Sequence, residues 1–234
     1  MIRLVLLVLA AFVPAACSTD AAPQAAAEAD TLVAVLPVDE AVRDPGFFAF
    51  RARLQRAIAA RDTTALLAVL DPSIKLSFGG DGGPERFREM WLEPNPRRRG
   101  LDVWPRLAEV LALGGRFWND SSFVAPYTFN PFGSGPPTEG YDAFAALIAL
   151  RDGVPVLAEA RAGADTLAVA SFGILTLDWR EDGEHYDEGW RAVRLPGDRP
   201  GYVRAGDVRS PIDYRAGFVR GLEGWRMTFF IAGD

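Results

Sequence analysis

The sequence is short of the side chains on which most catalytic and metal sites depend. It contains one cysteine and one histidine, and Lys75 is its only lysine. Most nucleophile–base pairs, and most nitrogen or sulfur metal sites, need at least two such side chains. We therefore expect no metal, no cofactor and no enzyme activity of these kinds, whereas mechanisms that use carboxylates alone stay open. One cysteine also excludes an internal disulfide, so apolar burial and hydrogen bonding must stabilise the fold.

Clustered positive charge is also lacking. The 234-residue chain has a formal net charge of -6, and residues 97–99 form its only block of consecutive arginines. Because phosphate backbones bind to clustered positive surfaces, we expect no nucleic-acid partner. The hydrophobic fraction of 49% and the charged fraction of 24% are typical of a folded chain, long enough for one large domain or two small ones.

The first residues have the pattern of an export signal. Arg3 precedes an apolar run over residues 4–13, which is too short to span a bilayer comfortably. Ala15 and Ala16 then precede Cys17, an arrangement that resembles the lipobox of bacterial lipoproteins. This resemblance implies a signal peptide over residues 1–16 and a lipid on Cys17. The alternative is cleavage by ordinary signal peptidase, which would release a soluble protein with a free thiol.

Residues 17–45 are predicted to be the lipid-anchor cysteine followed by a flexible tether. The alanine-rich residues 18–30 have too little apolar bulk to fold alone. Residues 32–38, an apolar run broken by Pro37, fit either an edge strand or part of the tether. Ser18 is not the aspartate that holds lipoproteins at the inner membrane of enteric-type bacteria. The resemblance therefore implies attachment to the outer membrane, on the periplasmic face of the cell envelope.

Helices and one strand are predicted between residues 47 and 113. Apolar residues recur at spacings of three and four over 47–60 and again over 65–70, which indicates two amphipathic helices, the second with Asp62 as its N-cap. Pro72 ends the second helix. A half-buried strand follows, indicated by three alternating apolar residues: Ile74, Leu76 and Phe78. After a glycine-rich loop at 79–83, further helices are predicted over 84–91 and 101–113.

Aromatic side chains are concentrated in residues 117–132. One interpretation is an exposed ligand surface. The favoured interpretation is a strand packed against the neighbouring helices, in which four residues alternate along one face: Phe123, Ala125, Tyr127 and Phe129.

From Gly153 the pattern changes to short β-branched stretches between Gly, Pro and Asp turns, which is typical of small strands in a barrel. These stretches resemble the strands of bacterial SH3 domains: residues 154–159, 168–177, 189–195, 201–203 and 207–211. The resemblance implies an SH3-like β-barrel, of a family that commonly binds cell-wall peptides or protein partners, over residues 140–211. Pro155 and Leu157 stand where the family usually carries Asn and Arg. The candidate binding residues in this region are aromatic: Trp179, Tyr186, Trp190 and Tyr202.

Residues 178–188 contain six acidic residues and one arginine. Such a segment could bind calcium, a hard cation that prefers oxygen ligands. The order of the acids does not fit an EF-hand loop. A solvated hairpin tip with His185 as an exposed member is therefore the favoured interpretation.

Residues 215–234 are predicted to form a hairpin with its turn at 221–224. Its second strand shows alternating apolar residues: Trp225, Met227, Phe229 and Ile231. These side chains must pack against something, and the nearest partner is the helix and strand unit of residues 47–115. Early helices with a terminal hairpin resemble the cone-shaped α+β domains of the nuclear-transport-factor type. The ending over 209–234 is also similar to a family of uncharacterised bacterial envelope proteins with an SH3 region.

These patterns together predict an α+β fold in which one α+β domain, residues 46–139 with 212–234, is interrupted by the SH3-like barrel of residues 140–211. The predicted function is that of a non-catalytic envelope lipoprotein. It would bind a peptide, a glycan or a protein partner through the barrel or through the groove between the two domains, with its lipid in the membrane.

Two other functions are left open. One is a small-molecule enzyme that uses a concave pocket of the α+β domain. Its general base would be Asp71, Asp81 or Asp213, and its proton donor Tyr127 or Tyr214. The other is a structural or assembly factor in which the barrel braces the α+β domain without an external ligand.

Overall fold

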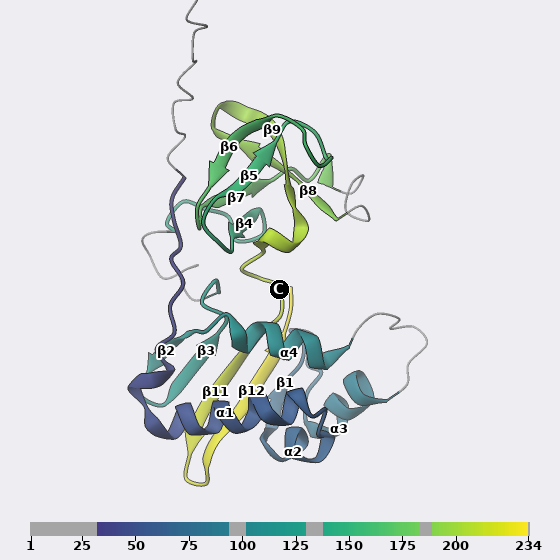
Figure 1. Cartoon of the computed structure of the whole chain (residues 1–234). Coiled ribbons are helices and arrows are strands. Elements are labelled where there is room, and N and C mark those ends of the chain that lie inside the picture. The colour runs from purple at the N-terminus through teal and green to yellow at the C-terminus, as the bar shows by residue number, and fades with distance from the viewer. Residues whose placement is uncertain (1–31, 94–101, 130–137, 183–188, 234) are drawn as a thin grey trace, which may run out of the picture.

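The described part of the chain is built around two β-sheets, and helices cover one of them (Figure 1). The structure is a computed structural model that describes residues 32–93, 102–129, 138–182 and 189–233. Both helices and strands are present, so the predicted α+β fold class is confirmed. None of the helices in these ranges is both long and apolar enough to cross a lipid bilayer.

The first sheet has five strands in the order β1-β12-β11-β3-β2. Its strands are β1 (Leu70–Lys75), β2 (Arg116–Asn119), β3 (Ser122–Ala125), β11 (Arg215–Gly221) and β12 (Gly224–Ile231). The hairpin predicted at the end of the chain is confirmed, because β11 and β12 pair in antiparallel fashion. β12 also pairs in parallel with β1, with Met227 opposite Leu70. The last strands of the chain therefore lie inside a sheet whose other members come from residues 70–125.

The predicted helices are also confirmed, and their caps explain where they begin. They are α1 (Pro45–Ala59), α2 (Thr63–Ala68), α3 (Pro84–Phe87) with the π-helical turn η2 (Arg88–Leu92), and α4 (Val103–Ala112). A short 3-10 turn, η1 (Ala41–Arg43), lies in the predicted tether and was not predicted. The carboxylate of Asp62 accepts a hydrogen bond from the Ala65 N–H at 2.9 Å, as predicted for an N-cap. Asp44 and Asp102 cap α1 and α4 in the same way. α1 and α4 lie across one face of the sheet (Figure 1).

We call the first sheet with its helices the first body, and the second sheet, described below, the second body. The core of the first body joins residues from the start of the described chain to residues from its end. The Phe47 ring, which is fully buried on α1, lies 4.2 Å from the ring of Phe123 and 4.8 Å from that of Trp225. Phe218 of β11 contacts the same ring at 5.6 Å between centroids. Each fully buried aromatic side chain contributes about 1.5–3 kcal/mol through burial alone. The terminal hairpin is therefore a structural part of this core.

Two strand predictions are wrong in detail. β1 begins at Leu70 and includes Pro72, which is tolerated because β1 is an edge strand. Phe78 lies beyond it and is exposed.

In β12, Phe229 pairs with Gly217 but Met227 pairs with Phe218, so the residue between them has no opposite partner. Such a bulge reverses the side-chain alternation. Phe230 is consequently buried, whereas Phe229 is only half-buried.

The predicted strand through the aromatic segment is shorter than expected. β3 ends at Ala125, before a cis peptide bond to Pro126, and the chain then turns. Phe123 packs in the core as predicted. Tyr127 is buried in the turn rather than in a strand, and Trp118 of the edge strand β2 is exposed.

The second sheet has seven strands in the order β10-β4-β7-β8-β9-β5-β6. They are β4 (Ala146–Ala149), β5 (Val154–Leu157), β6 (Thr166–Ala170), β7 (Ile174–Leu177), β8 (Trp190–Leu195), β9 (Arg199–Arg204) and β10 (Val208–Arg209), with 3-10 turns η4 (Pro196–Asp198) and η5 (Ala205–Asp207). The five stretches predicted to be strands are all found here, and β4 was missed. β10 and β6 are the two edges, and in the described ranges no pairing joins them. The pairing therefore does not show a closed barrel.

Residues 32–44, which were predicted to belong to the tether, are held against both sheets. The Val35 N–H donates to the Phe172 carbonyl at 2.8 Å, and the Glu40 N–H donates to the Gly115 carbonyl at 2.9 Å. The Asp39 carboxylate accepts two hydrogen bonds from Arg51, each at 2.7 Å. The part of the predicted tether that is described is therefore an ordered connection between the two bodies. Residues 1–31, with the predicted signal peptide and Cys17, lie outside the described ranges.

Candidate functional site

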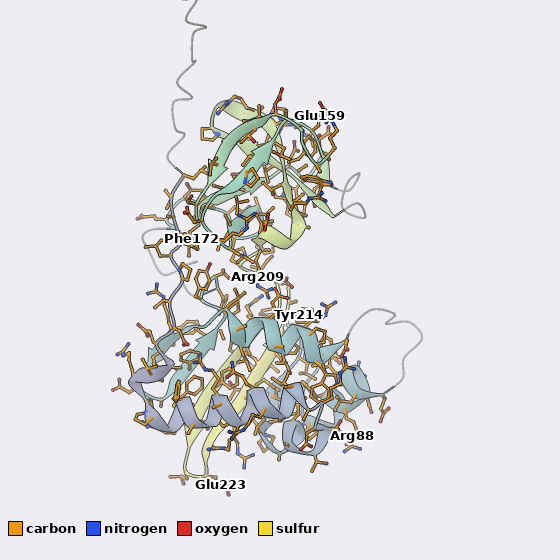
Figure 2. All side chains as sticks on the ribbon, in the orientation of Figure 1. Arg88, Glu159, Phe172, Arg209, Tyr214 and Glu223 are labelled. Atoms are coloured by element: carbon orange, nitrogen blue, oxygen red, sulfur yellow. The ribbon has the colours of Figure 1, made fainter. Side chains whose placement is uncertain are left out.

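A polar groove lies where the two sheets meet. Its volume is about 380 Å³, and its walls come from α4, from the end of β4, from β8 and from the segment that joins β10 to β11. Its lining residues are Glu109, Leu150, Arg191, Ala205, Gly206, Val208, Arg209, Ser210 and Asp213. Figure 2 shows Arg209 and Tyr214 at this junction. This groove therefore lies between α4 and strands of the second sheet.

Arg209 links the two bodies. It lies on β10, opposite Ile148 of β4, and its Nη1 donates a hydrogen bond to the Glu109 carboxylate on α4. The same nitrogen lies 3.5 Å from Oδ2 of Asp213. Nη2 donates to the Tyr214 carbonyl at 2.6 Å. One guanidinium thus holds the edge of the second sheet to the helical layer of the first body.

Burial makes these contacts necessary for Arg209. The Arg209 side chain is only 4% exposed, whereas the side chains of Glu109 and Asp213 are 52% and 46% exposed. A guanidinium that lost water without gaining partners would cost several kcal/mol. The two carboxylates compensate for that loss while about half of each side chain stays exposed to solvent. The groove lining therefore combines a buried cation with two half-exposed anions.

Tyr214 fixes the segment that carries Asp213. Its ring stacks on Phe230 with centroids 5.1 Å apart and meets Trp91 edge-on at 5.3 Å. The Arg106 guanidinium lies 5.2 Å from the Tyr214 ring centroid. The connection between β10 and β11 is thus packed into the first body.

On the side of the second sheet, the groove is lined by the side chain of Arg191 and by the backbone of the turn at Gly206. Nε of Arg191 donates to the Asp182 carboxylate at 2.7 Å, and that carboxylate also accepts from the Ala192 N–H. A Cβ placed on Gly206 would meet no atom within 4 Å, so the backbone of this turn borders open space. This side of the groove therefore carries an arginine that is ion-paired with Asp182 and an unobstructed peptide group at Gly206.

The predicted aromatic binding residues do not form one surface. Trp190 is 4% exposed, and the Arg204 guanidinium lies 3.9 Å from its ring centroid. Tyr202 packs against the small apolar cluster that contains Trp190. Trp179 is 65% exposed. Trp190 and Tyr202 therefore lie together but serve packing, while Tyr186 lies outside the described ranges.

The acidic segment is also partly structural. Asp178 forms an ion pair with Arg194 at 2.6 Å, and Asp182 pairs with Arg191. Both aspartates are buried, which differs from the expected solvated hairpin tip. His185 lies outside the described ranges. Within those ranges, no three acidic, histidine or cysteine side chains are grouped so that they could hold a metal ion.

The three acids considered as a general base are placed differently from one another. Asp71 accepts hydrogen bonds from the hydroxyl and the N–H of Ser73, and these bonds lower its pKa. Asp81 pairs with Arg86 at 3.0 Å. Only Asp213 of the three lines the groove. A general base needs a carboxylate whose pKa is raised towards neutrality, and the pKa of Asp71 moves in the opposite direction.

Tyr127, considered as a proton donor, is a buried core residue. Burial raises its pKa to about 12. Because the pKa in the folded state lies above the value of about 10 in the unfolded chain, this contribution to stability is complete below pH 10 and is lost as the pH rises through 12.

We expect Tyr127→Phe to keep the fold at neutral pH and to lose less stability than the unmodified protein between pH 10 and 12. Urea unfolding at a series of pH values measures this difference, and identical alkaline profiles would contradict the burial of the phenol.

Comparison with protein-family models, with curated proteins and with solved structures finds no match for this chain. The interpretation of the groove residues therefore rests on their geometry in this structure alone. Sequence patterns did not single out Glu109, Arg191 or Arg209. Glu109 and Arg209 are 100 positions apart, and each is an ordinary charged residue within its own element.

Proposed function

We propose that this protein is a non-catalytic lipoprotein of the bacterial cell envelope that binds a peptide, glycan or protein partner in the groove beside Arg209. The observation that carries the proposal is the groove itself, whose lining includes two arginines, Arg191 and Arg209, and two half-exposed carboxylates, Glu109 and Asp213. A peptide presents amino, carboxylate and amide groups together, so it matches such a mixture better than a purely anionic or apolar ligand does. The half-exposed Glu109 and Asp213 are the acceptors that a ligand would reach.

We further propose that residues 140–211 form an SH3-like module inserted into the α+β domain of residues 46–139 and 212–234. The support is the positions of β5 to β10, which follow the segments that resemble bacterial SH3 domains. The resemblance implies cell-wall peptides or proteins as ligands, which agrees with the polarity of the groove. Muropeptides, which carry both glycan and peptide, are therefore the first ligands to test.

A glycine-to-phenylalanine substitution in the groove tests this function. Gly206 has room for a side chain and lies on the groove wall, so Gly206→Phe is expected to fill the groove and to weaken muropeptide binding at least tenfold. Gly79→Phe is the matched control, because Gly79 also has room for a Cβ and lies in a loop far from the groove in sequence. Calorimetric titration of each variant with purified muropeptides measures the effect. No binding to the unmodified protein, or equal binding by both variants, would refute the proposal for this ligand class.

The proposed membrane anchor is Cys17. If signal peptidase II processes the chain, globomycin will cause the precursor to accumulate, and mass spectrometry of the mature N-terminus will find a diacylglyceryl group on Cys17. Cys17→Ser should then release the protein from membranes. A globomycin-insensitive chain that begins after Ala15 or Ala16 would instead identify a soluble exported protein.

A further inference from the structure

A second hollow, which we call the α1–α2 pocket, is lined by residues of α1, of α2 and of the turn end of the β11–β12 hairpin. Figure 1 shows this hairpin projecting past α1, and Figure 2 labels Glu223 at its tip. The volume of the pocket is about 380 Å³, which lies in the range of small-molecule sites. It shares no residue with the groove beside Arg209, so it is a separate candidate site.

The helices give this pocket an apolar lining. α1 contributes Phe50, Leu54 and Ala57, and α2 contributes Ala65 and Ala68. Phe50 and Leu54 belong to the core of the first body. The three alanines place only methyl groups beside the hollow, so the space between the helices and the hairpin is not filled. The pocket can therefore bury hydrocarbon.

Charged side chains complete the lining, and their sum is positive. They are Arg53, Arg226 and Glu223. Arg226 donates to the Glu223 carboxylate at 2.6 Å and to the Leu70 carbonyl at 3.3 Å, so its charge is balanced and its position is fixed. Arg53 is exposed, and no carboxylate in the described part of the chain pairs with it. The pocket thus carries one positive charge without a counterpart, in a chain whose net charge is -6.

We propose that the α1–α2 pocket binds a small carboxylic acid with an apolar body, such as an aliphatic monocarboxylate. The apolar body would lie against Leu54 and the three alanines and leave water. The carboxylate would pair with Arg53, because a guanidinium presents parallel N–H donors that match two carboxylate oxygens. The ligand would thus supply both the hydrocarbon and the negative charge that the pocket lacks.

The same two features exclude other ligand classes. A cation would be repelled by Arg53, and a phosphate or a sugar has no apolar surface to place against the alanines. The inference does not depend on the ligand proposed for the groove beside Arg209, because the two sites have no residue in common.

Three probes separate the two halves of the proposed ligand: hexanoate, 1-hexanol and acetate. Backbone amide shifts are followed in the full-length chain with Cys17→Ser, which prevents lipidation. Hexanoate is expected to give saturable shifts at Leu54, Ala57 and Ala65, with a dissociation constant on the order of 1 mM. Acetate should give none, because each buried methylene raises affinity about fourfold. 1-Hexanol, which has no charge, should bind about fivefold more weakly than hexanoate. No saturable shift with hexanoate, or equal binding of hexanoate and 1-hexanol, overturns the proposal.

Two substitutions test the residues that carry it. Arg53→Gln should weaken hexanoate about fivefold and leave 1-hexanol unchanged. Arg56→Gln is its control, because Arg56 is exposed on the same helix and does not line the pocket. Ala65→Leu should weaken both probes at least tenfold because the larger side chain occupies the hollow. Its control is Ala49→Leu, at an exposed position of α1 outside the pocket. Equal effects of a variant and its control overturn the proposal.

A peptide that ends in an apolar residue presents the same chemistry from another source. N-acetyl-alanyl-leucine, with a free carboxylate, tests this source. We expect it to bind more weakly than hexanoate, because its peptide groups would lose water beside the apolar lining without gaining partners. Tenfold tighter binding than hexanoate, with the loss on Arg53→Gln, would assign the pocket to the end of a peptide chain and overturn the proposal of a free acid.

Discussion

Replacing Phe47 by alanine is expected to lower the free energy of unfolding by about 3–5 kcal/mol. The side chain is fully buried, and its ring contacts three other aromatic rings that come from the middle and the end of the chain: Phe123, Phe218 and Trp225. Removing it leaves a cavity between α1 and the sheet that these neighbours cannot all fill. Urea unfolding followed by tryptophan fluorescence measures the loss.

The neighbouring residue is the natural control for this experiment. Phe48 has the same side chain on the same helix but is 47% exposed. Phe48→Ala is therefore expected to cost less than about 1 kcal/mol. Comparable losses for the two variants would mean that the terminal hairpin does not pack on α1 as described.

Replacing Arg209 by methionine is expected to cost about 2 kcal/mol and to loosen the contact between the two bodies. The change preserves apolar bulk but removes the hydrogen bonds to Glu109 and to the Tyr214 carbonyl, and bonds that involve a charged group contribute about 1.5–3 kcal/mol each. The effect is smaller than the sum of these bonds, because Glu109 is half-exposed and can regain water.

Two measurements separate this role from a general loss of stability. Urea unfolding gives the free energy, and hydrogen exchange reports the amides of β10 and α4, which should exchange faster in Arg209→Met than in the unmodified protein. Arg56→Met on the exposed face of α1 is the control and should change neither. Unchanged exchange at β10 and α4 would show that Arg209 does not hold the two bodies together.

Local sequence patterns were sufficient for elements that short stretches of residues specify, such as amphipathic helices, helix caps and hairpins. The spacing of apolar residues was sufficient for α1, and Asp62 was sufficient for the start of α2. The terminal hairpin was found because its two strands flank a short glycine-containing turn. β4 was missed because its four residues are all apolar and all buried, a pattern that strands share with buried helices.

Features that depend on tertiary contacts could not be predicted in this way. The bulge in β12 exchanges Phe229 for Phe230 in the core, and nothing near these residues distinguishes the two registers. Trp190 and Tyr202 have the composition of a binding surface, but composition does not tell a buried aromatic from an exposed one. The contact between Arg209 and Glu109 brings together residues that are distant in the sequence, so only the fold identifies the groove.

Chemical-shift mapping of backbone amides during a titration with purified muropeptides examines the proposed binding groove directly. Saturable shifts should be concentrated at Arg191, Gly206 and Ser210, and Gly206→Phe should abolish them without changing the rest of the spectrum. If saturable shifts instead cluster at the exposed Trp179, or if no residue of the groove responds to any concentration of ligand, the groove beside Arg209 is not the binding site.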